Sequence, residues 1–299
     1  MSPTRRSGHA GGEPARLSEA DPPIALTWLG WSGFRITGAG GTQLFIDPPK
    51  AADIPQDRDV QILLTHGHPE HVAGTIRYLA RDSRRARATV LASPRLSRVL
   101  ARRPKAPGDR LLGCRPGQTL AIGGVGVDVF EWRHMTLLPS GLRPALVRLC
   151  QLARRPGLAL RIAARAARIP RPGPMLGFRL TLGHGRRLMF FGEGLHRKTD
   201  AEAVTRVVRR LPAEIGIIAV EPEDMDVLPP LIARLRLRTA VLYEAHGPWR
   251  DAFHMPRADL DALRLALGGA GMTGIKAVPG ERRDLPALMP TASASGITG

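Results

Sequence analysis

Three histidines, His66, His68 and His71, stand within a stretch of six residues. The chain holds nine histidines in all, so a third of them are gathered here. Neutral imidazole is the commonest side-chain ligand for zinc and related metals, and closely spaced residues at a strand end can surround one point. The segment therefore predicts a metal site, and a loop that is merely rich in histidine is the weaker interpretation.

The elements around this cluster are those expected to position it. Residues 61–65 form a short apolar run of strand length, and residues 72–81 have the periodicity of a helix. The histidines thus occupy the connection between a strand and a helix. Further strands are predicted along the chain, at 25–29, 34–37, 43–46, 88–92, 175–182, 187–191, 215–220, 239–244 and 275–278. Helices are predicted at 94–103, from Thr199 or Asp200 to 211, and at 258–267.

The spacing His66-Gly67-His68-Pro69-Glu70-His71, after an apolar strand that ends in Thr65, resembles the signature of the metallo-β-lactamase superfamily. The superfamily normally has Asp where this chain has Glu70. Three later segments resemble the other ligand positions of that superfamily. They are His134 after the strands at 117–132, Gly192-Glu193-Gly194, where Glu again replaces Asp, and His246-Gly247 after the strand at 239–244.

The opening strands also carry a resemblance. The sequence TWLGWSGFRI followed by LFIDP resembles the branch that contains L-ascorbate-6-phosphate lactonase and N-acyl phosphatidylethanolamine phospholipase D. That branch often has His where this chain has Trp31, which is predicted to line the mouth of the site or to have a packing role.

The resemblance implies a layered α/β (α+β) fold, an αββα sandwich of two mixed sheets flanked by helices, with a metal site along one edge. Residues 1–23 are rich in Gly, Pro, Ser and charge, which predicts a disordered tail. A single domain is expected at 24–283, followed by a flexible tail at 284–299. Two metal positions follow from the resemblance, and Glu70, Glu193 and His246 would be the catalytic residues. The ligands of the first metal would be His66, His68 and His134, those of the second Glu70, His71 and His246, and Glu193 would bridge the two.

The reaction implied is hydrolysis by a metal-bound hydroxide, with zinc as the expected ion, one or two per chain. Each Asp-to-Glu change adds a methylene, which displaces the carboxylate by more than the roughly 0.2 Å that a metal–ligand bond tolerates unless the backbone shifts. Because both positions stay carboxylates, we expect a retained site of altered geometry, with manganese or iron as further candidates. His196 and His254 are secondary candidates as proton carriers.

Residues 140–174 differ in character from the rest. Leu142, Leu146, Leu149, Cys150 and Ala153 recur at helical spacing, and a second helical segment follows a break at Pro156-Gly157. From 141 to 174 there are eight Arg and no acidic residue. This predicts a basic amphipathic helical insertion that lies on an anionic membrane, covers the site as a lid, or packs on the domain.

The net charge of +18 suits an anionic partner, here an anionic small molecule or lipid as substrate and peripheral contact with an anionic membrane. The lack of an apolar run of eighteen residues, and of an apolar segment after Arg5-Arg6, predicts a cytoplasmic location. A nuclease is the alternative, but aromatic residues make up only 4% of the chain, which leaves few platforms for stacked bases. A non-catalytic metal-binding protein on the same scaffold is a further alternative. The sequence gives no oligomeric state.

Overall fold

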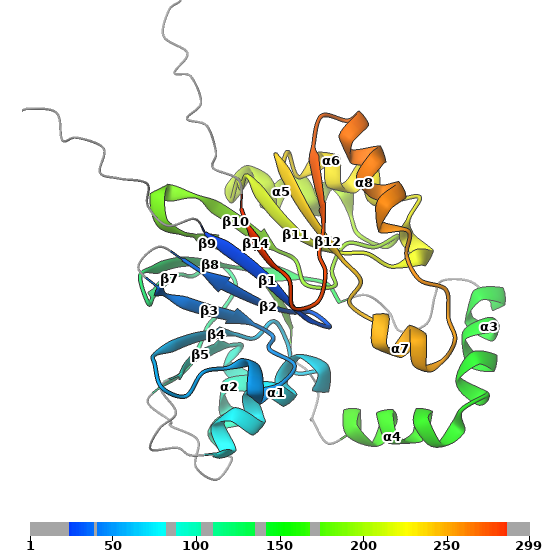
Figure 1. The fold of residues 1–299 in the computed structure, drawn as a ribbon, viewed down its shortest axis with the longest axis horizontal. Helices are drawn as coiled ribbons and strands as arrows, with labels where there is room; N and C mark the ends of the chain where they lie inside the picture. Colours follow the sequence, from blue (N-terminus) through cyan, green and yellow to red (C-terminus); the bar gives the residue numbers. More distant parts are fainter. Residues whose placement is uncertain are drawn as a thin grey trace, which may run out of the picture.

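The computed structural model describes residues 24–38, 41–81, 88–102, 110–134, 142–167 and 174–285. Within these ranges the strands form two seven-stranded sheets that lie face to face (Figure 1). The predicted tail at 1–23 and residues 286–299 lie outside them. Ordered structure continues two residues beyond the predicted boundary at 283, because Leu285 is buried and its backbone N–H donates to the carbonyl of Ile24 at 2.8 Å.

The first sheet combines the N-terminal strands with the last strand of the chain. Its order is β14-β1-β2-β3-β4-β5-β6, antiparallel from β14 to β3 and parallel from β3 to β6. The strands are β1 (Ala25–Gly30), β2 (Gly33–Thr37), β3 (Gln43–Ile46), β4 (Val60–Leu63), β5 (Ala88–Ala92), β6 (Leu111–Gly113) and β14 (Arg282–Asp284).

The second sheet repeats this plan. Its order is β13-β12-β11-β10-β9-β8-β7, antiparallel from β7 to β10 and parallel from β10 to β13. The strands are β7 (Thr119–Ile122), β8 (Val125–Trp132), β9 (Met175–Thr181), β10 (Arg187–Phe190), β11 (Ile215–Ala219), β12 (Thr239–Tyr243) and β13 (Thr273–Lys276).

Helices cover the outer face of each sheet (Figure 1). The first sheet packs against α1 (Pro69–Arg81) and α2 (Pro94–Ala101), and the second against α5 (Ala201–Arg210), α6 (Leu228–Arg234) and α8 (Leu260–Gly269). A third apolar cluster fills the space between the sheets. The predicted αββα sandwich of two mixed sheets is therefore confirmed.

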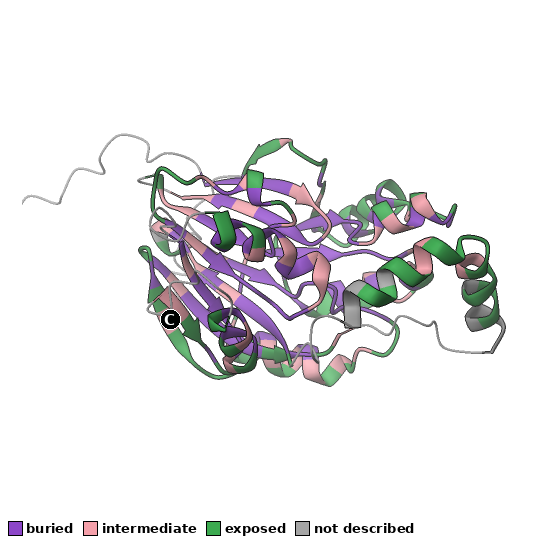
Figure 2. Cartoon of the chain, turned by 90° about the horizontal axis from the view of Figure 1, so that it is seen from below, coloured by how far each residue is buried: buried purple, intermediate pink, exposed green. Residues whose placement is uncertain are grey.

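Strand β11 shows why the central strands read as continuous apolar runs. All five of its residues are buried, since the strand has a sheet on one side and helices on the other. Ile215 and Ile217 point into the layer between the sheets, whereas Ile218 packs under the helices. In any strand, successive side chains alternate between the two faces of the sheet, but here both faces are buried. Figure 2 shows the same concentration of buried residues on the strands.

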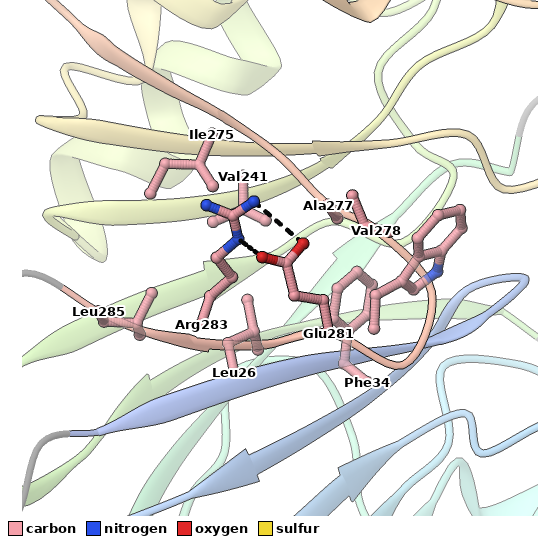
Figure 3. A pocket seen from close by; sticks show the side chains of 10 residues that line it. Leu26, Phe34, Val241, Ile275, Ala277, Val278, Glu281, Arg283 and Leu285 are labelled. Carbon is pink, nitrogen blue, oxygen red and sulfur yellow. Dashed lines mark hydrogen bonds and ion pairs between the residues drawn. The ribbon is translucent and has the colours of Figure 1, made fainter.

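A narrow pocket lies between β1 and the strands β12 and β13 (Figure 3). Its walls are almost entirely apolar, and an ion pair between Arg283 Nε and Glu281 Oε1, 2.8 Å long, crosses it. None of the predicted metal ligands lines this pocket, so it is separate from the candidate site.

The predicted helical insertion is present as two helices, α3 (Leu142–Ala153) and α4 (Pro156–Ala167). Pro156 is the first residue of α4, the position at which proline suits a helix, so the predicted break lies where one helix gives way to the next. Among the helices of the described ranges, none is both long and apolar enough to cross a membrane.

Candidate metal centre

The connections that follow β4, β8, β10 and β12 bring the predicted ligands together. The ligand atoms of His66, His68 and His134 all lie within 4.8 Å of one another, and so do those of His66, His71 and Glu193. Residues more than a hundred positions apart in sequence thus meet at one point, because each lies in a connection that follows one of these strands.

The imidazole rings pack directly against each other. The ring centroid of His66 lies 4.0 Å from that of His71 and 4.7 Å from that of His134, and the rings of His68 and His134 are 4.6 Å apart. His66 and His71 are buried, whereas His68 and His134 are partly exposed. The cluster therefore has a dry inner side and an outer side that solvent or substrate can reach.

Glu193 is the acceptor at the centre of the cluster. Its Oε1 lies 3.0 Å from His71 Nε2 and 3.5 Å from His246 Nε2, and its Oε2 lies 3.2 Å from His134 Nε2. The hydroxyl of Ser32 donates to Oε1 at 3.0 Å. A single carboxylate, 1% exposed, thus faces three imidazole nitrogens from three connections of the fold.

Asp47 fixes the orientation of two of the histidines from behind. It accepts hydrogen bonds from the backbone N–H of Thr65 at 2.8 Å, from the Thr65 hydroxyl at 2.5 Å and from His71 Nδ1 at 2.7 Å. Because the Thr65 hydrogen points to Asp47, its oxygen accepts from His66 Nδ1 at 2.9 Å. Both rings therefore carry their hydrogen on Nδ1 and turn Nε2 towards the cluster, the usual arrangement of histidine ligands.

Glu221 performs the same task for His246. Its Oε1 accepts from His246 Nδ1 at 2.7 Å, and its Oε2 accepts from Arg250 Nε at 3.0 Å. Arg250 Nη2 donates to the same oxygen. Both Glu221 and Arg250 are buried, so this ion pair holds the His246 ring with its Nε2 towards Glu193.

The protonation states fit a site built for a cation. Burial lowers the pKa of His66 well below its usual value and that of His68 to about 4, so both are neutral, as ligands must be. Burial also lowers the pKa of His71 and His246, but nearby carboxylates outweigh it, and the pKa of His71 ends well above normal and that of His246 at about 9. Burial raises the pKa of Glu193, yet His246 and His71 bring it well below normal, so it is ionised.

The pairing of acceptor atoms in the cluster also fits a metal site. The Nε2 of His71 and the Oε1 of Glu193 are both acceptors once Nδ1 carries the ring hydrogen, and at 3.0 Å they need a proton or a cation between them. A divalent cation can replace the proton there. Four or more imidazoles with one carboxylate suit zinc, and also manganese or iron.

Glu70 is not brought into either ligand group of the described residues. It lies partly buried in the first turn of α1, close enough to His246 to contribute to the raised pKa of that ring. The division of the ligands between two metals, with Glu70 at the second, stays a prediction.

Three residues of the site were not recognised in the sequence. Asp47 follows β3 directly and has a positive φ of 44°, a strained conformation typical of functional positions. Ser32 lies in the turn between β1 and β2. Glu221 follows the buried strand β11 directly, is 5% exposed and holds His246. An acid directly after a buried strand was the available signal.

The remaining candidates lie around the site. His196 is buried, and its Nδ1 accepts from the backbone N–H of Lys198 at 3.1 Å, which puts the ring hydrogen on Nε2. His254 Nε2 lies 2.6 Å from Arg155, so this ring nitrogen is directed at the helical insertion and not at the histidine cluster. The ring of Trp31 lies edge to face against that of Trp249, with 6.1 Å between the ring centroids. The ring centroid of Trp249 also lies 6.3 Å from that of His246.

Comparison with solved structures identifies the architecture as the metallo-β-lactamase fold. The protein YhfI from Bacillus subtilis, a metallo-β-lactamase fold protein, superposes with a TM-score of 0.58 at 12% identity over 88% of this chain and 99% of that one. CmlA from Streptomyces venezuelae, a diiron β-hydroxylase, superposes with a TM-score of 0.60 at 16% identity over 90% of this chain and 55% of its own. At such identities the likeness shows the fold alone.

Curated relatives give a similarity in sequence. A UPF0173 metal-dependent hydrolase of Rhizobium etli is 37% identical over 120 residues, and one of Halorubrum lacusprofundi is 31% identical over 111 residues. These alignments take in 37% and 36% of this chain, and they span 48% and 37% of the respective relatives. No family model matches the chain.

Proposed function

We propose that this protein is a metal-dependent hydrolase that acts on a phosphoester, ester or lactone of an anionic small molecule or lipid. The observation that carries the proposal is the convergence of His66, His68, His71 and His134 on Glu193, with Asp47 orienting two of the rings. The metallo-β-lactamase fold and the similarity to relatives named metal-dependent hydrolases support it.

The residues that would hold a metal are the four histidines of the cluster with Glu193, and His246 faces the same carboxylate. A bound divalent cation supplies Lewis acidity and activates water at neutral pH. The chain's own contribution is orientation, because Asp47 and Glu221 turn the ring nitrogens inward before anything binds. Such preorganisation removes a cost of rearrangement during the reaction.

His196 is proposed as a hydrogen-bond donor to the leaving group, through the Nε2–H of its neutral ring. Burial, followed by the charges of His134 and Lys198, lowers its pKa, and its Nε2 hydrogen has no acceptor among the described residues. A buried N–H without a partner is costly, so such groups call for a functional explanation. A leaving oxygen in the site would supply the missing acceptor.

Exposed basic residues favour an anionic substrate. Arg133 precedes His134 directly, and Lys198 follows Glu193 closely in sequence, both exposed to solvent. Arg197 is exposed as well, but it pairs with Asp226 at 2.5 Å. Positive charge at the rim of a site raises the local concentration of anions and their rate of association. The edge-to-face pair of Trp31 and Trp249 beside His246 offers an apolar wall for the rest of the substrate.

The finer assignment to the branch of L-ascorbate-6-phosphate lactonase and N-acyl phosphatidylethanolamine phospholipase D is also a proposal. It is supported by the opening strands, TWLGWSGFRI and LFIDP. Trp31 departs from that branch, which often has His at this position. The proposal of a cytoplasmic protein with peripheral membrane contact accompanies it.

The test is a substrate panel with the purified protein after exchange into zinc, manganese or iron. The panel contains a chromogenic phosphodiester, a phosphomonoester, a carboxylic ester, a lactone, and labelled RNA and DNA. We expect turnover of a small anionic ester or lactone that falls to background in His68→Ala. His254→Asn is the matched control, because it removes a histidine outside the cluster and Asn tolerates the positive φ of 54° at that position.

Two results would overturn the proposal. Cleavage of RNA or DNA with no turnover of small esters would identify the protein as a nuclease. A metal-loaded protein that turns over no member of the panel would favour a non-catalytic metal-binding protein.

A further inference from the structure

Helices α3 and α4 stand apart from the sandwich. In Figure 1 they lie outside both sheets, on the side of α7 (Gly247–Ala252), and Figure 2 shows them mostly exposed. Together they are the basic arm, residues 142–167. Of the three alternatives for this insertion, packing of its apolar stripe on the domain does not fit the described side chains of that stripe, which are exposed.

The apolar stripe of α3 faces solvent. Leu146, Leu149, Cys150 and Ala153 follow the i, i+3, i+4, i+7 spacing of one helix face, and all four are exposed. Leu146 and Leu149 are each 50% exposed, and Leu160 on α4 is 72% exposed. A helix face of this kind normally lies against a core, and large apolar residues left together in water mark a surface that meets a partner.

The charge of the arm indicates the kind of partner. The segment from 141 to 174 holds eight Arg and no acidic residue. Of the described side chains, Arg154, Arg155 and Arg161 are exposed. The surface therefore combines leucine side chains with a uniformly positive charge, the two components by which amphipathic helices bind anionic lipid bilayers.

We propose that the basic arm is a docking surface for an anionic lipid bilayer. Leu146, Leu149 and Leu160 would enter the boundary between headgroups and acyl chains, and the arginines would contact the lipid phosphates. A second copy of the arm fits poorly, since it would bring arginines against arginines without an acid to pair them. Nucleic acid accounts for the arginines but not for the exposed leucines, and the arm has no aromatic residue to stack on a base.

The arm is tied to the candidate metal centre at two places. The chain enters it shortly after the predicted ligand His134, and Arg155 at the junction of α3 and α4 contacts His254, just beyond α7. His246 caps the other end of α7. Docking of the arm would therefore hold the open side of the metal centre near the bilayer. The docking itself does not depend on the proposed hydrolase activity.

The first experiment measures sedimentation of the full chain with vesicles of phosphatidylcholine alone, or with about one third phosphatidylglycerol, at low and high salt. We expect binding to the anionic vesicles at low salt, lost at high salt and absent from the neutral vesicles. The variant Leu146→Glu/Leu149→Glu should weaken binding about tenfold or more. Leu265→Glu is the matched control, because Leu265 is 70% exposed on α8, and it should bind like the unchanged protein.

The second experiment measures the accessibility of the apolar stripe, through the rate at which a maleimide labels Cys150. The two cysteines are Cys150, which is exposed on α3, and Cys114, which is buried. Burial also raises the pKa of the Cys114 thiol to about 12, so a maleimide reports on Cys150. We expect anionic vesicles to slow the labelling of Cys150 several-fold, and neutral vesicles to leave it unchanged.

Several outcomes would overturn the proposal. They are no sedimentation with anionic vesicles at low salt, equal binding of the double Glu variant with its melting temperature unchanged, or equal labelling of Cys150 with and without vesicles. Protection of Cys150 that depends on protein concentration and not on lipid would assign the stripe to a second copy. Retention of a short RNA in place of vesicles would assign the arginines to nucleic acid.

Discussion

Replacing Glu221 by Gln tests whether the carboxylate behind His246 supports metal binding. In the protein, Glu221 accepts from His246 Nδ1 at 2.7 Å and from Arg250 Nε at 3.0 Å. The side-chain oxygen of Gln can still accept one of these two hydrogen bonds. Its NH2 group, which only donates, would then face the other donor. The negative charge that would make His246 a stronger metal ligand is removed as well.

The size of the effect follows from these contacts. Removal of a carboxylate that orients a histidine ligand costs about 10–100-fold in metal affinity, or roughly 1.4–2.8 kcal/mol. The Arg250 side chain is 2% exposed and would keep Glu223, whose side chain is 38% exposed, as its nearest acidic partner. Loss of one partner from a buried ion pair costs about 3 kcal/mol or more of folding stability.

Glu223→Gln is the matched control. Glu223 also contacts Arg250, at 2.5 Å, whereas Glu221 is the carboxylate that accepts from His246 Nδ1. We expect both variants to melt at a lower temperature than the unchanged protein, and only Glu221→Gln to bind metal more weakly. The assay is competition against a chromophoric chelator for zinc and for manganese. Equal metal affinity in all three proteins would refute the role of Glu221, whatever their stabilities.

Two further predictions concern pH and packing. Nearby carboxylates outweigh burial and hold the pKa of His246 at about 9, so the metal-free ring carries a proton below that pH. Metal affinity should therefore rise with pH towards about 9, and calorimetry in buffers of different ionisation enthalpy should detect the protons that metal binding releases. A metal affinity that does not change with pH would be the contrary result. Gly194→Ala should destabilise the protein by about 1–3 kcal/mol in thermal melts, since its Cβ would lie 1.8 Å from the buried Trp132 indole. Gly268→Ala, which meets nothing within 4 Å, should leave stability unchanged or higher by about 0.5–1 kcal/mol, and equal melting of the two would contradict the packing argument.

The sandwich could be predicted from the sequence because its strands are apolar runs bounded by clear turns. Strands as short as β6 (Leu111–Gly113) and β14 (Arg282–Asp284) were not predicted. Both lie at an edge of the first sheet, and all three residues of β14 are exposed. Such strands are defined by their pairing with a neighbour, which a local pattern does not contain.

The candidate site could be predicted as far as its imidazoles, because spacing and strand ends identify them. The supporting residues were harder to recognise, since Asp47 and Glu221 look like any acid after a strand. Their roles depend on contacts with His71 and His246 across 24 and 25 residues, which only the folded chain shows. The surroundings of the apolar stripe of the basic arm stayed open between three alternatives for a similar reason: periodicity predicts an apolar face but not what covers it.

The central claim is that the histidine cluster and Glu193 hold a metal. Elemental analysis of the purified protein, after metal exchange and removal of loosely bound ions, tests it most directly beside His68→Ala and the control His254→Asn. The account predicts one or two ions per chain in the unchanged protein and in the control, and a loss of metal in His68→Ala. A folded protein that takes up no zinc, manganese or iron, or a His68→Ala variant that retains the full metal content, would contradict it.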